Sequence, residues 1–354
     1  MARSRRVRVL VAAASGATAA LALAFGLAGS ANADERAFEL EAPGARSVYL
    51  AGEMTGWDRH KLPLHRDADG KWRVVVDLAN EEWLYKFIVD GRWTADPGTA
   101  DHDADGQGGQ HSFLFVGRGD WDEIPGVSKG RVETRMVESE SSPSPRKVNV
   151  YLPPGFDPGK PPPVLWLLHG SGMDADQWLR TGKVDRYMDN LISRRAIHPF
   201  VIVMPSSGNV PYTGTSEAFI THELRTWLAK TYGLATERAT SAVAGMSMGG
   251  FGAFALPLRH PDLYGFGFAL RGYYSDGYIT SLPRGGALPM QTRILCGSDD
   301  ALVDANRRLV RALKERRGEF YYREDAGGHT WQYWSNRMVE MLTTVDAYFD
   351  AGRR

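Results

Sequence analysis

The stretch at residues 240–258 constrains the fold of this chain more than any other. An apolar, β-favouring run ends in Gly-x-Ser-x-Gly at residues 245–249, and a small-residue, helix-compatible segment follows. This order predicts a strand, a sharp turn and a helix, with Ser247 at the apex of the turn. The glycines Gly245 and Gly249 remove side chains that would clash in so tight a turn. We interpret Ser247 as a nucleophile, against the alternative of a chance match in a chain with 39 glycines.

From residue 131 onward, strand patterns alternate with helix patterns. Strands are expected at residues 131–139, 147–152, 164–168, 200–204, 240–244, 292–296 and 319–323, and helices at residues 184–195, 216–232, 248–260, 302–317 and 331–349. Alternation at this spacing predicts an α/β fold, with a doubly wound and mainly parallel sheet that helices cover on both faces.

A serine hydroxyl needs a base that takes its proton, and the base needs an acid that holds it in the correct tautomer. In α/β-hydrolases these residues follow in the order Ser, Asp or Glu, His. Of nine histidines, His260 and His329 come after Ser247. His260 ends the helix that follows the serine, far from the sheet edge, whereas His329 lies in a Gly-rich loop after the last strand. We therefore expect His329 to be the base.

The acid is expected just past a strand, where two adjacent carboxylates, Asp299 and Asp300, follow the apolar run at residues 292–296. Either carboxylate could instead cap the helix that follows, a position that Asp favours. The spacing alone leaves both residues open as the acid.

A His-Gly loop at residues 169–172 follows an expected strand and completes the set of catalytic features. Backbone N–H groups of such a loop, and of the residue after the nucleophile, stabilise the oxyanion in hydrolases of this kind. We expect Ser171 and Met248 to supply these donors. His169 is expected to orient the loop and not to act as a second base.

The segment at residues 37–116 shows a different, all-β pattern. Period-two alternation at residues 47–51, 71–78 and 84–89 is separated by turn residues, and Asp90-Gly91 is typical of a two-residue hairpin. About eighty residues of this kind predict a small, immunoglobulin-like β-sandwich. Trp72 alternates with Val74 and Val76, so we place it in the core.

Three motifs in this segment, at residues 51–57, 62–64 and 85–97, resemble the glycogen-binding (family 48) carbohydrate-binding module. The resemblance implies that Trp57 and Trp93 stack on sugar rings and that Lys86 bonds to hydroxyls. Flat aromatic rings suit the apolar C–H faces of sugars. The paired asparagines of that family are replaced by His111-Ser112 in this chain. The alternative is that the module only braces the second domain.

From about residue 131 to the C-terminus, several motifs together resemble the esterase D, feruloyl esterase and antigen 85 group, and also the enterochelin esterases. These motifs stand at residues 151–156, 169–172, 223–224, 245–250 and 328–331. In the resembling esterases the acid is the third residue after the glycine, which here selects Asp300 over Asp299. No segment resembles a lipase cap, so we expect a shallow cleft, with Trp178, Tyr212 and Trp331 in loops near it.

The first 33 residues have the pattern of a signal peptide. Four arginines within residues 3–8 precede an Ala/Leu-rich stretch, and Ala31-Asn32-Ala33 is a small-x-small cleavage site. The expected domains are therefore a signal peptide at residues 1–33, a β-sandwich at 34–117, a linker at 118–130 and a catalytic domain at 131–354. Ser4-Arg5-Arg6 also suggests a twin-arginine route.

Charge and cysteine content exclude several classes of partner. Without residues 1–33 the chain carries 38 basic and 42 acidic side chains, a net charge near −4 that disfavours nucleic acid. Cys296 is the single cysteine, so no intramolecular disulfide can form. Asp101 to Gly106 copies the start of a calcium loop, but Ser112 stands where the closing glutamate is needed. We expect no metal, no cofactor and no membrane span.

Together these features predict a secreted serine esterase that acts on acylated carbohydrate, such as feruloyl or acetyl esters of polysaccharide. Three alternatives stay open. The chain could hydrolyse a catechol siderophore ester, transfer acyl groups to a sugar as mycolyltransferases do, or bind carbohydrate on an inactive hydrolase scaffold.

Overall fold

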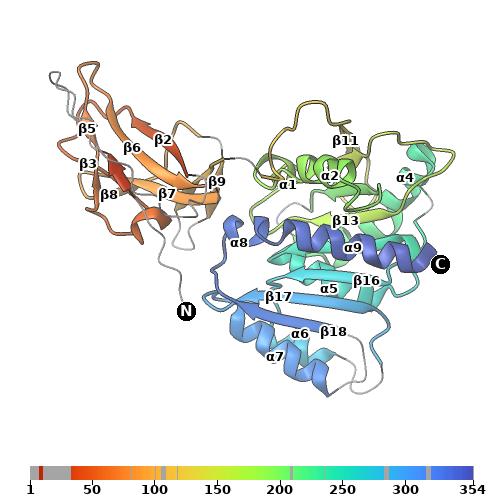
Figure 1. Cartoon of the computed structure of the whole chain (residues 1–354). Helices are drawn as coiled ribbons and strands as arrows, with labels where there is room; N and C mark the ends of the chain where they lie inside the picture. The colour runs from red at the N-terminus through yellow and green to blue at the C-terminus, as the bar shows by residue number, and fades with distance from the viewer. Residues whose placement is uncertain are drawn as a thin grey trace, which may run out of the picture. The chain divides into compact units, whose positions relative to one another are not determined.

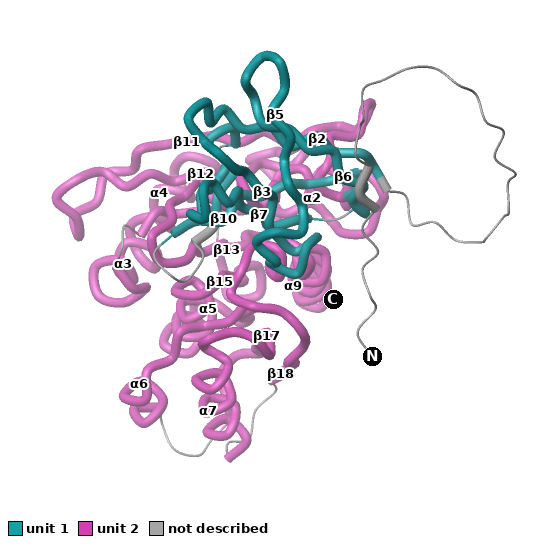
Figure 2. The backbone as a smooth tube through the Cα atoms, turned by 90° about the vertical axis from the view of Figure 1, so that its left-hand side faces the viewer, with its two compact units in different colours: residues 1–119 teal, residues 120–354 magenta. Residues whose placement is uncertain are grey.

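The computed structural model describes residues 8–10 and 33–353, apart from residues 81, 100, 105–108, 118, 208–209, 235, 283–286 and 316–319. The chain divides into two compact units, Met1–Gly119 and Asp120–Arg354 (Figure 2). Each unit has a hydrophobic core of its own. The expected signal peptide at residues 1–33 lies outside the described residues, except for Arg8–Leu10 (β1) and Ala33.

Unit 1 is built from two antiparallel sheets in the part of the chain that the structure describes (Figure 1). One sheet has the order β1-β6-β2, with β5 also paired to β6; it comprises β1, β2 (Ala33–Leu40), β5 (His65–Arg66) and β6 (Trp72–Ala79). The other has the order β4-β3-β7-β10-β9, with β8 paired to β7; it comprises β3 (Val48–Gly52), β4 (Leu62–Pro63), β7 (Glu82–Val89), β8 (Arg92–Thr94), β9 (His102–Ala104) and β10 (Gln110–Phe115). A short 3-10 helix, η1 (Glu53–Thr55), follows β3.

The core of unit 1 lies between these two sheets. β6 alternates buried and half-buried residues, the period-two pattern of a strand with one face on a core. Leu50, Trp72, Val76 and Phe87 belong to the same buried cluster, to which both sheets contribute. Unit 1 is therefore a β-sandwich with Trp72 in its core.

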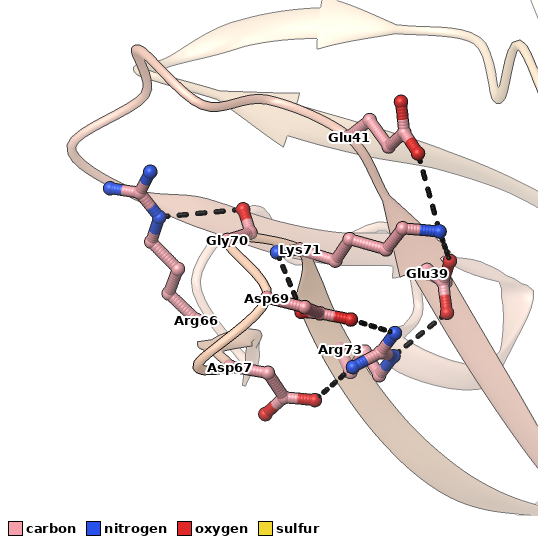
Figure 3. A network of polar contacts seen from close by, with 8 residues as sticks. All are labelled: Glu39, Glu41, Arg66, Asp67, Asp69, Gly70, Lys71 and Arg73. Carbon is pink, nitrogen blue, oxygen red and sulfur yellow. Dashed lines mark hydrogen bonds and ion pairs between the residues drawn. The ribbon is translucent and has the colours of Figure 1, made fainter.

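The other face of the β6 sheet carries a network of charged side chains (Figure 3). The Nζ of Lys71 and the Nε of Arg73 lie 2.6 Å and 2.7 Å from the two carboxylate oxygens of Glu39. Arg73 also contacts Asp67 and lies 2.7 Å from Asp69. Because these groups are exposed, water and salt screen their attraction, and the network contributes little to the free energy of unfolding.

Unit 2 contains a sheet of eight strands within its described residues (Figure 1). In spatial order the strands are β11 (Arg131–Val137), β12 (Arg146–Leu152), β14 (Val201–Pro205), β13 (Val164–Leu168), β15 (Ser241–Met246), β16 (Phe266–Leu270), β17 (Gln291–Gly297) and β18 (Phe320–Asp325). The pairs β11–β12 and β12–β14 are antiparallel, and all later pairs are parallel. Strands β13, β14, β15 and β16 are buried along their whole length, as expected for a sheet that helices cover on both faces.

Helices cover this sheet on both faces. They are α1 (Gln177–Arg180), α2 (Val184–Ser193), α3 (Gly214–Ala218), α4 (Leu224–Tyr232), α5 (Met248–Arg259), α6 (Asp276–Ser281), α7 (Val303–Lys314), α8 (Trp331–Ser335) and α9 (Met338–Arg353), with a π-helical turn at Phe219–Glu223 and a 3-10 turn at Arg238–Thr240. Side chains of α4, α5 and α7 pack with Val164, Trp166 and Leu168 in one core cluster. Helices α2 and α9 pack against each other, and α9 also contacts β15 and β16. The α/β class predicted from the sequence is therefore confirmed.

Several elements differ from the sequence-based expectation. The expectation missed β16, because Gly267 interrupts its apolar run, and it missed the short helices α1 and α6. The helix expected at residues 216–232 is divided by the π-helical turn, and the one expected at residues 331–349 is divided into α8 and α9.

Part of the expected linker at residues 118–130 packs on unit 2. The Nδ2 of Asn190 on α2 donates hydrogen bonds to the carbonyls of Asp120 and Asp122, at 2.9 Å and 2.8 Å. Arg194 pairs with the Asp120 carboxylate. The chain is thus held against α2 from Asp120 onward.

Candidate active site

Strand β15 runs into helix α5 with a single residue, Ser247, between them. Ser247 has φ 54° and ψ −117°, and positive φ is uncommon for a residue with a side chain. A Cβ at Gly249 would collide with the carbonyl of Leu168, so the neighbouring strand can approach only a glycine here. The backbone N–H of Ser247 donates to Leu270 at 2.9 Å. This strained turn places Ser247 at the carboxyl edge of the parallel strands, where functional strain is typically found.

Ser247, His329 and Asp300 form a continuous chain of hydrogen-bonding groups. The Nε2 of His329 lies 3.0 Å from the Oγ of Ser247, and its Nδ1 lies 2.9 Å from the Oδ2 of Asp300. Asp300 follows β17, and His329 lies between β18 and α8. Asp300 comes 53 positions after Ser247, and His329 comes 29 positions after Asp300, so the structure brings together residues that are far apart in the chain. Their distances are those needed for proton transfer from serine to histidine.

The environment of Asp300 keeps its carboxylate ionised. The residue is 2% exposed, and its Oδ1 accepts a hydrogen bond from the backbone N–H of Leu302 at 2.7 Å. Burial by itself raises the pKa of the carboxyl group, but the hydrogen bond from His329, the Leu302 N–H and the charge of Arg271 outweigh it, so the pKa is lowered. The Nη1 of Arg271 lies 3.0 Å from the Oδ2 of Asp300.

The sequence analysis missed Arg271. It follows β16, the strand that was also missed, and no local motif marks it. The pairing of β16 with β17 places residues just past the ends of these two strands side by side. A strand assigned at residues 266–270 would have indicated a residue at the same sheet edge as Asp300.

The competing candidates for base and acid lie elsewhere. The Nε2 of His260 lies 2.6 Å from the carboxylate of Glu217, at the end of α5. The side chain of Asp299 is exposed, and the Oγ of Ser298 lies 3.4 Å from it. Neither residue takes part in the chain of hydrogen bonds to Ser247.

The expected oxyanion donors lie beside the serine. Met248 is the first residue of α5, directly after Ser247. On the other side, a Cβ at Gly170 would lie 3.4 Å from the Cβ of Ser247, so the loop that carries Ser171 runs past the nucleophile. This placement is compatible with N–H donors from Ser171 and Met248.

His169 is held in one tautomer at the base of this loop. Its Nε2 accepts a hydrogen bond from the backbone N–H of Ser207 at 3.0 Å, so the proton resides on Nδ1, which lies 2.8 Å from the carbonyl of Gly170. Burial lowers the pKa of the His169 imidazole. The ring therefore joins the loops after β13 and β14 and stays neutral.

The aromatic residues expected in loops near the cleft are buried. Trp178, Tyr212 and Trp331 have no exposed surface, and Trp178 and Trp331 lie in helices α1 and α8. Trp331 packs edge-to-face with Trp178 and with Trp334, at ring separations of 5.3 Å and 5.2 Å. Trp334 in turn packs edge-to-face on His329 at 5.3 Å. These rings support the loop of His329 and do not form an exposed surface.

Tyr273 is an aromatic residue near the nucleophile that the sequence analysis did not single out. Its backbone N–H donates to the carbonyl of Ser247 at 3.3 Å, and the residue is 58% exposed. An exposed side chain whose backbone is hydrogen-bonded to Ser247 is available for contact with a bound ligand.

Unit 1 brings together the residues that were expected to bind carbohydrate. The rings of Trp57 and Trp93 lie 6.2 Å apart, and the Nζ of Lys86 lies 5.9 Å from the centre of Trp93. His111 lies 4.5 Å from the ring of Trp57, so the residue that replaces an asparagine adds a third ring. Trp93 is 42% exposed, and Trp57, in the turn that follows η1, has a φ of 64°, which is uncommon for a residue with a side chain.

The remaining candidates from the sequence are Cys296 and the acidic segment at residues 101–106. Cys296 is buried, which raises the pKa of its thiol to about 12. Residues 105–106 of the segment that copies the start of a calcium loop lie outside the described residues, and among those described no group of three or more His, Cys, Asp or Glu could hold a metal. Of the described helices, none is long and apolar enough to cross a membrane.

Comparisons with known proteins find similarity in both parts of the chain. Residues 139–276 match the esterase family, and residues 37–122 match the glycogen recognition site of AMP-activated protein kinase. An endo-1,4-β-xylanase/feruloyl esterase of Xylanibacter ruminicola is 30% identical over 254 residues. The match covers 66% of this chain, which spans about a third (34%) of the length of that relative.

Two solved structures resemble the chain in fold. A ferulic acid esterase has a TM-score of 0.56 at 25% identity and covers 62% of this chain and 99% of its own. The enterobactin esterase of Shigella flexneri has a TM-score of 0.65 at 18% identity and covers 88% of this chain and 92% of its own. The second match extends over most of both units, and at this identity it concerns the fold alone.

Proposed function

We propose that unit 2 hydrolyses carboxylic esters through an acyl-enzyme formed on Ser247, because residues 139–276 match the esterase family. The observation that carries this proposal is the hydrogen-bonded series Ser247, His329 and Asp300 at a strained strand–helix turn. His329 is the base, and Asp300 holds its tautomer and stabilises the imidazolium.

The reaction proceeds in two halves. The Nε2 of His329 takes the Oγ proton as Ser247 attacks the ester carbonyl, and the N–H groups of Ser171 and Met248 stabilise the resulting oxyanion. Collapse of the tetrahedral intermediate breaks the ester C–O bond, and His329 returns its proton to the departing alcohol. Water, deprotonated by His329, then attacks the acyl-enzyme and releases the acid and free Ser247.

The substrate class that we propose is acylated carbohydrate, with feruloyl or acetyl groups on polysaccharide. The glycogen-recognition match of unit 1 supports this proposal, as does the relative that carries xylanase and feruloyl esterase activities in its name. In unit 1 the exposed ring of Trp93 and the half-buried ring of Trp57, with Lys86 beside Trp93, would hold the glycan. We further propose that residues 1–33 direct export and are removed before Asp34.

A panel of esters tests the function. Turnover of p-nitrophenyl acetate, and labelling of Ser247 alone by a serine-directed phosphonate, are expected if the mechanism is correct. Methyl ferulate and acetylated xylan are then expected to be hydrolysed faster than enterobactin. A preference for enterobactin would favour the siderophore-esterase alternative, and acyl transfer to trehalose would favour the transferase alternative. No turnover and no labelling would leave a carbohydrate-binding protein on an inactive scaffold.

The export proposal has its own test. N-terminal sequencing of the protein recovered from the medium of an expressing bacterial host is expected to begin at Asp34. A protein that stays in the cell with residues 1–33 attached would contradict it.

A further inference from the structure

Arg271 is a fully buried arginine that no step of the proposed mechanism uses. It lies directly after β16 with φ 53°, a conformation uncommon for residues with a side chain. Its side chain and that of Asp300 have no exposed surface, and the Nη1 of Arg271 lies 3.0 Å from the Oδ2 of Asp300. Because desolvating a guanidinium is costly, such a residue needs a strong local partner.

The surrounding chain makes room for this guanidinium. A Cβ at Gly297 would lie 2.7 Å from the Nη2 of Arg271, and a Cβ at Gly327 would lie 3.4 Å from the same atom. The guanidinium carbon of Arg271 lies 3.5 Å from the centre of the Tyr333 ring. The Tyr333 hydroxyl donates to the carboxylate of Asp325 at 2.7 Å, which holds the ring in place. Two glycines and a fixed aromatic ring thus form the seat of Arg271.

The position of Arg271 keeps its side chain away from the protein surface. With no exposed area, Arg271 cannot contact a substrate. None of its three guanidinium nitrogens makes an aligned hydrogen bond in the described structure, so charge and ring stacking hold it. Its anionic partner is Asp300.

Arg271 and His329 share one oxygen of Asp300. The Nδ1 of His329 lies 2.9 Å from the same Oδ2 that faces Arg271, while the Oδ1 accepts from Leu302. A fixed positive charge beside this oxygen weakens the hold of the Asp300–His329 pair on an additional proton.

Few other groups can change the charge of this cluster. Burial raises the pKa of Cys296 to about 12 and raises that of Tyr333 as well, so both stay neutral near pH 7. Asp325 and Arg337 are paired with each other at 2.5 Å on the far side of the Tyr333 hydroxyl group. The proton balance near Ser247 therefore depends on Arg271, Asp300 and His329.

We propose that Arg271 is a positioning residue for the Asp300–His329 pair. Its guanidinium holds the carboxylate of Asp300 ionised and allows His329 to act as a free base at a lower pH than it could without this charge. This inference rests on the proposed function, because it assigns a role within the same site. When the guanidinium is removed, less positive charge opposes the binding of a proton to His329 or to Asp300. Both routes raise the pH at which the pair loses its proton.

The test compares Arg271→Met and Arg271→Gln, which remove the charge, with Arg271→Lys, which keeps it. The acid limb of the pH profile of kcat/KM for p-nitrophenyl acetate is expected to move up by about one pH unit or more in both neutral variants. Lysine is expected to restore most of the wild-type profile. The matched control is Arg337→Met. The guanidinium of Arg337 lies 4.7 Å from the centre of the same Tyr333 ring but pairs with Asp325, so the acid limb of this variant should stay at the wild-type position.

A second readout does not depend on turnover. The ¹⁵N shifts of the His329 imidazole, followed by NMR against pH, are expected to move in the same direction in the neutral variants. If one neutral variant fails to fold, the other carries the test. If neither neutral variant folds, a lysine variant that folds and titrates like the wild type supports the need for a positive charge. A lysine variant that also fails to fold would show that the role of Arg271 is purely structural and would contradict the inference.

Unchanged acid limbs and unchanged His329 titrations in folded neutral variants would overturn the inference. Failure of the proposed function gives a different result: the wild-type protein would not turn over esters, while the NMR titration would still decide the role of Arg271.

Discussion

The triad of unit 2 and the aromatic group of unit 1 are both candidate sites, but they are built in opposite ways. Asp300 is 2% exposed and is held by Leu302, His329 and Arg271, whereas Trp93 is 42% exposed and has rings and cations around it. A site that performs chemistry needs atoms fixed to fractions of an ångström, which burial provides. A site that holds a flexible glycan needs accessible flat surface. Substitutions in the two sites should therefore differ greatly in size and in what they affect.

The largest effect is expected at the nucleophile. Ser247→Ala removes the attacking oxygen and should lower kcat for p-nitrophenyl acetate by about 10⁶-fold, since triad members act as a unit. Glycan binding by unit 1 should be unchanged, as measured by affinity electrophoresis in an α-glucan or xylan gel. Activity like that of the wild type would remove Ser247 from the mechanism.

A smaller effect is expected at the acid, where two adjacent residues provide a matched pair. Asp300→Asn mis-sets the tautomer of His329 and should lower kcat by about 10⁴-fold. Asp299→Asn changes an exposed side chain and should leave kcat within about threefold of wild type, in line with surface substitutions. The reverse ranking would assign the acid to Asp299 and would contradict the observed hydrogen bond.

At the aromatic group of unit 1, effects on affinity should replace effects on catalysis. Trp57→Ala and Trp93→Ala should each weaken binding of a glucan or xylan oligosaccharide by about 1–3 kcal/mol, the range for one aromatic stacking surface on a nucleic-acid base. Turnover of p-nitrophenyl acetate should not change, whereas turnover of polymeric substrate should fall. Normal glycan binding in both variants would make unit 1 a brace without a sugar site.

The smallest effect is expected in the exposed charge network of Figure 3, which contrasts with the buried pair of Arg271 and Asp300. Arg73→Met removes contacts to Asp67, Asp69 and Glu39 that water already screens. A small decrease of Tm is expected in low salt, and it should vanish in 1 M NaCl. A large, salt-independent decrease would show that the network stabilises the sandwich as strongly as a buried pair.

Much of the molecule could be predicted from short, local patterns. Both family resemblances and the α/β class are confirmed by the comparisons and the fold. The roles of Ser247, His329 and Asp300 stay predictions, although the structure places all three within hydrogen-bonding distance. Local patterns worked here because a tight turn, a hairpin and the end of a strand each restrict which residues can occupy them.

Prediction failed where long-range packing decides. Trp178 and Trp331 were expected in loops near the cleft, yet they lie in the helices α1 and α8 and are fully buried, with Trp331 packed between Trp178 and Trp334. Burial of a large ring depends on which other rings meet it, and those rings come from separate helices. Gly267 hid β16 for a related reason, since a strand in the middle of a parallel sheet is stabilised by its neighbours more than by its own propensity.

The sequence by itself determined the turn around Ser247 and the order in which Ser247, Asp300 and His329 follow at the ends of strands, because each depends on a few adjacent residues and on chain direction. The tertiary structure alone decided that Arg271 faces Asp300. Those residues are 29 positions apart and meet only because β16 and β17 pair in parallel, with Gly297 and Gly327 leaving space for the guanidinium. Pairing between strands and the space behind them are properties of the packed chain, so no local pattern could reveal them.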